Sequence, residues 1–189
     1  MNSSRTCRIL CLFEIFGKGT IISFSHIYDI LGNCGFQVSK KTVYRDVKLL
    51  KRAGILQVYY SQKEKAYIPA DGDFMHGSCI RYTPEGNFSP PALPENRTQR
   101  LYMERIIRLC RIMVDVIEEE IEDPFGWYRR NYPELSDRTR QRDFELLREI
   151  GYKMKYWPED ADGPAGYYYD YPDKCTGGLP EWARRKGYV

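Results

Sequence analysis

The chain lacks the sequence features of a membrane protein and of a secreted one. No segment approaches the roughly 20 consecutive apolar residues that a helix needs to cross a bilayer. The early apolar run at residues 9–13 is interrupted by Glu14 and has no small-residue cleavage site after it, so it is not typical of a signal peptide. We therefore expect a cytoplasmic chain with no membrane partner.

Motifs of the common enzyme classes are also missing. The sequence contains no phosphate-binding Gly-x-x-x-x-Gly-Lys loop, no dinucleotide-binding glycine fingerprint and no His-Glu-x-x-His zinc motif. It has only two histidines, and neither lies in a recognisable catalytic setting. We expect a binding protein and not an enzyme, with no catalytic residues and no cofactor.

Cysteines are present but are not spaced as metal ligands. Six occur, at positions 7, 11, 34, 79, 110 and 175, without any Cys-x-x-Cys pair. A zinc site formed by Cys7, Cys11, Cys34 and His26 is the alternative, but the missing pair favours buried free thiols and no metal.

What the chain does have is a repeat with a period of 97 residues. Residues 39–54 and 136–151 match without a gap at seven of sixteen positions. The same offset pairs Arg8-Ile9 with Arg105-Ile106. A repeat of this length predicts two separate folding units rather than the links of a solenoid.

The first copy of the repeated stretch has the pattern of an amphipathic helix. Ser39 is a favourable N-cap and Gly54 a favourable C-terminal stop. Apolar side chains recur at helical spacing on one side. The other side carries six cations, one tyrosine and no carboxylate: Lys40, Lys41, Tyr44, Arg45, Lys48, Lys51 and Arg52. An ordinary solvated helix is the simpler interpretation, but such helices usually alternate acidic and basic residues.

A β-hairpin is predicted directly after this helix. Residues 55–60 are β-prone, 61–64 form a polar turn and 65–69 can return. Two earlier helices, at 5–16 and after Ser23 or Ser25, precede it. Three helices and a hairpin in this order predict a winged helix-turn-helix, whose third helix enters the DNA major groove.

The pattern Thr-x-x-Arg-Asp-aliphatic-x-x-Leu before a glycine and a hairpin resembles the recognition helix of DeoR-type repressors. It is still more similar to the N-terminal DNA-binding domain of WYL-domain transcription factors. The matching residues are Thr42, Arg45, Asp46, Val47 and Leu50 in the first copy, and Thr139, Arg142, Asp143, Phe144 and Leu147 in the second. The Gly166–Tyr169 stretch is similar to the wing of that family. No part of the chain resembles the ligand-sensing WYL domain, so no effector function is implied.

These observations predict an α+β fold, mainly α, with two tandem winged helix-turn-helix domains. We expect domain 1 at 1–70, a Pro/Gly-rich linker at 71–96, domain 2 at 97–171 and a C-terminal tail at 172–189. Domain 1 holds 11 Lys and Arg against 4 Asp and Glu, a net charge of +7, which suits a polyanionic partner. As a flexible coil the linker would span about 28 Å, comparable with the roughly 34 Å between successive major-groove faces.

The second copy gives a different prediction for its partner. The outward face of its recognition-like helix is nearly neutral, although Arg138, Gln141 and Arg142 lie in the half that reaches base edges. Arg140, on the apolar side, must either extend to solvent or meet an acid. We expect weaker DNA binding here, or a protein partner. The long helix predicted at 97–122 is a candidate homodimer surface, although core packing within its own domain is the alternative that we favour.

The chain is therefore interpreted as a sequence-specific regulator that binds double-stranded DNA. Helix 39–53 would enter the major groove and hairpin 55–69 would serve as the wing. Asp46 and Asp143 are interpreted as acids that orient neighbouring basic side chains. A protein-interaction scaffold in a replication or chromosome-maintenance complex is the alternative. The residues predicted to contact DNA are Lys40, Lys41, Thr42, Tyr44, Arg45, Lys48, Lys63, Lys65, Arg138, Gln141 and Arg142.

Overall fold

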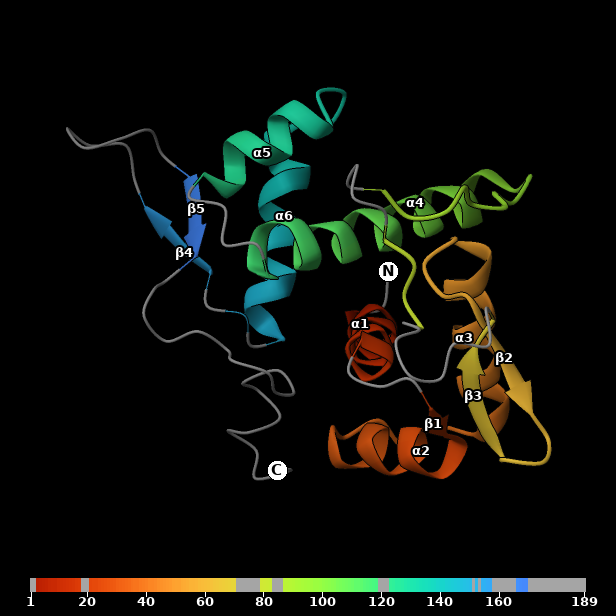
Figure 1. Cartoon of the computed structure of the whole chain (residues 1–189). Coiled ribbons are helices and arrows are strands. Elements are labelled where there is room, and N and C mark those ends of the chain that lie inside the picture. The colour runs from red at the N-terminus through yellow and green to blue at the C-terminus, as the bar shows by residue number, and fades with distance from the viewer. Residues whose placement is uncertain are drawn as a thin grey trace. The chain divides into compact units, whose positions relative to one another are not determined.

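The described chain is α+β and mainly helical, as predicted (Figure 1). The fold is that of a computed structural model, which describes residues 3–17, 21–70, 79–82, 87–118, 123–150, 152, 154–157 and 166–169. The chain divides into two compact units, 1–110 and 111–189. The predicted tail at 172–189 lies outside the described residues.

The first unit begins with three helices and a small sheet. Its elements are α1 (Ser3–Gly17), β1 (Ile22–Ser23), α2 (Phe24–Asn33), α3 (Lys40–Arg52), β2 (Val58–Ser61) and β3 (Ala66–Pro69). The three strands are antiparallel in the order β1-β3-β2, so β3 lies between the first strand and the hairpin partner. The hairpin and the three helices predicted from the sequence are confirmed, whereas the short strand β1 was not predicted.

Helix α1 is the centre of the first unit. Its apolar stripe of Ile9, Leu12, Phe13 and Phe16 is buried, and so are Leu10 and Cys11 on its other sides. A helix that is apolar nearly all round must be enclosed, and α1 accordingly packs against both α2 and α3. Each fully buried aliphatic side chain stabilises the fold by about 1.5–3 kcal/mol. Packing against α1 therefore holds α3 in a fixed position.

Residues after the hairpin return to the same unit. Backbone bonds join Gln57 N–H to Cys79 C=O (3.0 Å), Arg81 N–H to Ile55 C=O (3.1 Å) and Ala92 N–H to Arg52 C=O (2.7 Å). Phe88 is buried, with its ring 6.2 Å from that of Phe13. The described part of 71–96 therefore differs from the flexible linker that its proline and glycine content suggested, because Cys79 and Phe88 supply apolar anchors.

Helix α4 (Arg97–Arg111) begins in the first unit and is followed by a π-helix, η1 (Ile112–Glu118). The long helix predicted at 97–122 is confirmed over residues 97–118, although its second half is a π-helix instead of an α-helix. Leu101 is 52% exposed because Tyr102 and Met103 occupy the inward face of α4. The homodimer at 97–122 stays a prediction.

The second unit repeats the helical pair and hairpin of the first. It contains α5 (Pro124–Asn131), α6 (Asp137–Glu149), β4 (Met154–Trp157) and β5 (Gly166–Tyr169). Asp123 caps α5 by accepting from Gly126 N–H at 2.7 Å. Phe125, Trp127 and Tyr128 are buried.

The repeat is reproduced in the backbone. Helices α3 and α6 both have 13 residues, and each end of α6 lies 97 positions after the matching end of α3. Ser39 and Ser136 cap them alike, accepting from Thr42 N–H and Thr139 N–H at 3.3 Å in each case. The second-copy positions matching β1 fall at 119–120, outside the described residues.

Candidate nucleic-acid interface

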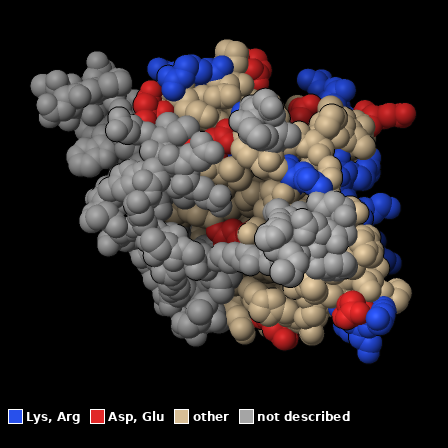
Figure 2. All heavy atoms as spheres, viewed as in Figure 1, with Lys and Arg blue, Asp and Glu red and all other residues tan. Residues whose placement is uncertain are grey.

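The basic side chains of α3 all face solvent. Lys40, Lys41, Arg45, Lys48, Lys51 and Arg52 are exposed, and within the described part of the chain none of them forms an ion pair. Figure 2 shows Lys and Arg atoms along the edge of the first unit where α3 and the hairpin lie in Figure 1. We call these six residues the α3 ridge. The ridge offers uncompensated positive charge to an anionic partner.

The opposite side of α3 is fixed by apolar packing and by one buried ion pair. Val43, Val47 and Leu50 are buried. Asp46 is 1% exposed and accepts from Arg8 Nε of α1 at 2.6 Å. The interpretation of Asp46 as an acid that orients adjacent basic side chains is therefore wrong. It points away from the ridge because position 46 lies on the same helical face as Val43 and Leu50, where it joins α3 to α1.

Two further groups extend this ion pair towards α4. Arg5 Nε lies 3.8 Å from the second Asp46 oxygen and is 48% exposed. The Arg5 guanidinium also lies over the Tyr102 ring, 4.9 Å from its centroid. The carboxylate on α3 therefore sets the positions of side chains from α1, and through them of a contact with α4.

Tyr44 is part of an aromatic cluster and is only partly available to a ligand. Its ring stacks on Phe24 of α2, with centroids 4.8 Å apart, and meets Tyr60 of β2 edge-on at 6.3 Å. Desolvation raises the pKa of Tyr44, and the neighbouring Tyr60 adds to the shift. The hydroxyl is therefore a neutral hydrogen-bond donor at physiological pH. The cluster holds α2, α3 and the hairpin together beside the ridge.

The remaining predicted contacts of the first unit lie at the helix start and at the hairpin turn. Thr42 is half-buried, and its hydroxyl lies 3.1 Å from the Ser39 hydroxyl. This places Thr42 in the cap of the helix. Lys63 and Lys65 are exposed in the turn, where Lys63 lies 3.8 Å from Glu64 and Lys65 adopts φ +49°. An exposed pair of this kind contributes little, so both lysines stay available to phosphates.

The matching helix of the second unit presents a mixed surface. Arg138 and Arg142 are exposed and Gln141 is half-buried. Asp137 accepts from Arg129 at 2.8 Å and from Arg140 at 2.6 Å. The hydrogen bond from Arg129 lowers the pKa of Asp137. The start of α6 thus carries an ionised carboxylate, which disfavours a phosphate at that point.

Buried polar groups in the second unit follow the pattern of the first with different partners. Arg140 is 5% exposed and pairs with Asp137, which is one of the two outcomes predicted for it. It also donates to Tyr132 C=O at 2.6 Å. Asp143 is fully buried and accepts from the Tyr128 hydroxyl at 2.6 Å. Like Asp46, it is an anchor within the core of its own unit.

No protein-family model, curated protein or solved structure matches the chain. Among the residues that the structure describes, no helix combines the length and apolarity needed to span a bilayer. The same residues contain no group of three or more His, Cys, Asp or Glu that could hold a metal ion. Their cysteines are thiols that form no disulfide with one another: Cys7, Cys11, Cys34, Cys79 and Cys110.

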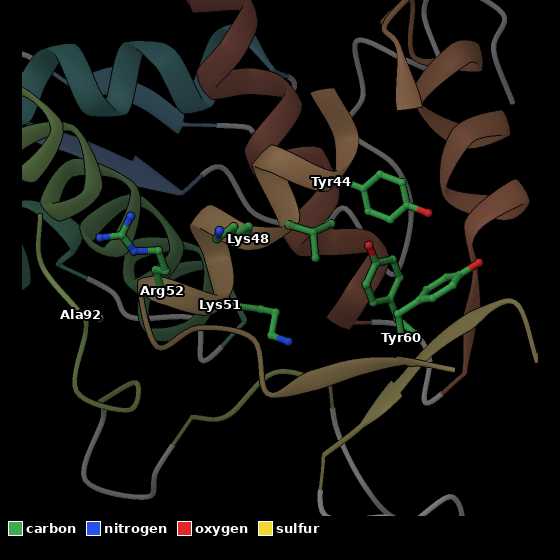
Figure 3. A pocket seen from close by; sticks show the side chains of 8 residues that line it. Tyr44, Lys48, Lys51, Arg52, Tyr60 and Ala92 are labelled. Atoms are coloured by element: carbon green, nitrogen blue, oxygen red, sulfur yellow. The ribbon is translucent and has the colours of Figure 1, made fainter. Parts of the chain in front are cut away.

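The sequence prediction assigned no binding role to Lys51 and Arg52. Both belong to the exposed face that the helical pattern identified, but they lie past the first half of the helix. Their significance depends on the hairpin and on Ala92, which lie beside them (Figure 3). Only a prediction of where residues 87–96 return could have found that surface.

Proposed function

We propose that the chain is a sequence-specific, double-stranded DNA-binding transcriptional regulator, in which α3 enters the major groove. The observation that carries this proposal is the α3 ridge, whose six exposed basic side chains form no ion pair with any described residue. DNA carries one negative charge per roughly 1.7 Å of helix axis, so such a ridge gains affinity by releasing counterions.

The order of elements supports the same proposal. The first unit runs α1, β1, α2, α3, β2, β3, with a sheet order of β1-β3-β2. This order is the one expected of a winged helix-turn-helix, the motif whose recognition helix the Thr42–Leu50 pattern resembles. The hairpin would then serve as the wing beside the recognition helix. The buried core and the Arg8–Asp46 pair hold α3 rigidly, and rigid supports favour defined base contacts.

We assign different roles to the two ends of the interface. Lys40, Lys41 and Arg45 lie in the first half of α3, which reaches base edges in this motif. Arg45 can donate two hydrogen bonds to a guanine. Lys63 and Lys65 in the turn would contact phosphates, which fix position without reading sequence.

The second unit would bind DNA more weakly. Arg138, Gln141 and Arg142 are suitable donors, but the carboxylate of Asp137 lies beside them and Glu145 and Glu149 follow on exposed positions. This mixed surface favours, for the second unit, the alternative of a protein-binding scaffold.

Selection of bound duplexes from a random pool, followed by affinity measurements at several salt concentrations, tests the proposal. With five or six phosphate contacts, the binding constant should fall about a thousandfold between 50 and 200 mM salt, given a slope of about −0.9 per contact. Affinity that hardly changes over this range, or a pool that yields no sequence motif, would contradict the proposal.

An Arg45→Ala, Lys48→Ala double variant separates the two candidate functions. Both side chains are exposed, so we expect a folded protein that has lost its affinity for the selected duplex. A chain that binds a protein partner but has no affinity for any duplex would instead support the scaffold.

A further inference from the structure

A groove of about 580 Å³ lies between the C-terminal half of α3 and the hairpin (Figure 3). Its size is within the roughly 300–1,000 Å³ that is typical of small-molecule sites. The lining residues come from α3, both hairpin strands and the segment before α4: Tyr44, Val47, Lys48, Lys51, Arg52, Tyr60, Tyr67 and Ala92.

The charged side chains that line the groove, among the described residues, are all cationic. Lys48, Lys51 and Arg52 are spaced i, i+3 and i+4, which places them on one face of α3. All three are exposed and without ion pairs among the described residues, and none of the described residues that line the groove is a carboxylate. Figure 3 shows Lys51 extending from α3 towards the hairpin. Three donors on one face of the helix, with no acid among the described lining residues, suit an anion such as a phosphate.

The other side of the groove is apolar and aromatic. Val47 is 2% and Tyr67 4% exposed. The Tyr60 ring lies 5.2 Å from that of Tyr67 and points from the hairpin towards Tyr44 (Figure 3). Burial raises the pKa of Tyr67, so its phenol stays neutral. The half-buried Tyr60 ring is the part of this side that a planar ring can contact, and aromatic rings favour stacked or edge-on contacts.

Part of the groove's lining comes from a segment distant in sequence from α3. Ala92 is held by the bond from its N–H to Arg52 C=O, and Gln57 Nε2 donates to Ser89 Oγ at 2.6 Å. This wall is therefore fixed before any ligand arrives, which lowers the entropic cost of binding.

We propose that this groove binds a small organic anion that combines one phosphate with one flat ring, of the size of a nucleoside monophosphate. The phosphate lies against Lys48, Lys51 and Arg52, and the ring lies against Tyr60. The source is either a free nucleotide or the phosphorylated end of a nucleic-acid strand, since both carry the same chemical unit. Binding itself does not depend on the proposed function in duplex recognition.

Adenosine monophosphate labelled with a methylanthraniloyl group on its ribose is the probe, titrated with the full chain and followed by fluorescence anisotropy. We expect saturable binding. Unlabelled adenosine monophosphate should displace the probe better than either adenosine or inorganic phosphate. A dinucleotide with a 5′-phosphate that displaces it better still identifies a strand end as the source; otherwise the free nucleotide is the source. No saturation at millimolar probe, or equal displacement by inorganic phosphate or by adenosine, overturns the proposal.

Two pairs of variants locate the site. Ala92→Trp fills the groove without changing its charge, whereas Leu93→Trp adds the same ring to an exposed neighbour that does not line it. We expect Ala92→Trp to weaken probe binding at least about tenfold, the usual effect of losing hydrogen bonds to a charged group, and Leu93→Trp to leave it unchanged. Equal effects of the two would overturn the proposal.

A second pair of variants tests the charge of the groove separately from its volume. Lys51→Gln with Arg52→Gln should weaken probe binding at least about tenfold. Lys40→Gln with Lys41→Gln makes the same change of charge at the other end of α3 and should leave probe binding intact. Equal loss in both double variants would indicate diffuse attraction and overturn the site. Duplex affinity measured on the same four proteins reports on the proposed function independently, so either can fail alone.

Discussion

Removal of the Asp46 carboxylate should destabilise the first unit by about 3–5 kcal/mol, the usual effect of breaking one partner of a buried ion pair. Both partners of the ion pair are buried: Asp46 is 1% and Arg8 9% exposed, and Arg8 Nε lies 2.6 Å from the Asp46 carboxylate. Asp46→Ala leaves the Arg8 guanidinium enclosed without its carboxylate. Arg5 also loses a contact, but at 3.8 Å and 48% exposure that contact adds little.

Urea unfolding followed by circular dichroism, together with amide hydrogen exchange of α1 and α3 peptides, measures this effect. All three tryptophans, Trp127, Trp157 and Trp182, lie in the second unit, so their fluorescence does not report directly on the first. We expect faster exchange in α3 and an earlier unfolding transition. Asp29→Ala removes an exposed carboxylate from α2 and should change stability by less than about 0.5 kcal/mol.

A double variant tests whether Asp46→Ala destabilises the protein by leaving a buried charge unpaired or by removing side-chain packing. Arg8→Met with Asp46→Leu replaces the pair by apolar side chains, and such replacements are often neutral or stabilising. It should recover most of the stability lost in Asp46→Ala. A cost below about 1 kcal/mol for Asp46→Ala, or a double variant less stable than the single one, would refute the reasoning, since a broken buried pair costs several times more.

Two further predictions concern the backbone at the ends of the helices. Gly54 has φ +75°, and a Cβ there would lie 1.9 Å from Ser89 C=O, so Gly54→Ala should cost about 2 kcal/mol or more in urea unfolding. Gly32→Ala, in α2 with nothing within 4 Å, should instead stabilise by about 0.5–1 kcal/mol, and a loss there would contradict the backbone assignment. Ser39→Ala and Ser136→Ala should each cost about 1 kcal/mol, read from exchange in α3 and α6, because both hydroxyls accept from an orphan amide. Stability costs that differ strongly between Ser39→Ala and Ser136→Ala would contradict the equivalence of the two caps.

The helices, the caps and the hairpin of the first unit were predictable because their determinants are local. Ser39 and Gly54 bound α3, and its apolar positions recur at helical spacing. The 97-residue offset then placed α6 and its cap without further information. Local propensity and hydrophobic periodicity were sufficient for these elements.

Features that depend on distant partners were missed. Arg8 and Asp46 are 38 residues apart, although their joint recurrence as Arg105 and Asp143 was a signal that the acid belongs to the fold. The two-residue strand β1 is too short for periodicity to reveal. Residues 79–92 were interpreted from their prolines and glycines, whereas Cys79 and Phe88 determine where that segment lies. Without its position, the groove beside Lys51 and Arg52 could not be inferred.

The most direct test of the central claim compares the same substitution at matching positions of the two helices. Arg45 and Arg142 lie 97 residues apart, on α3 and α6, and both are exposed. With the selected duplex at fixed salt, Arg45→Gln should raise the dissociation constant by about tenfold or more, as expected for a base-contacting arginine. Arg142→Gln should change it by far less. Equal losses, or the greater loss from Arg142→Gln, would contradict the assignment of DNA recognition to the α3 ridge.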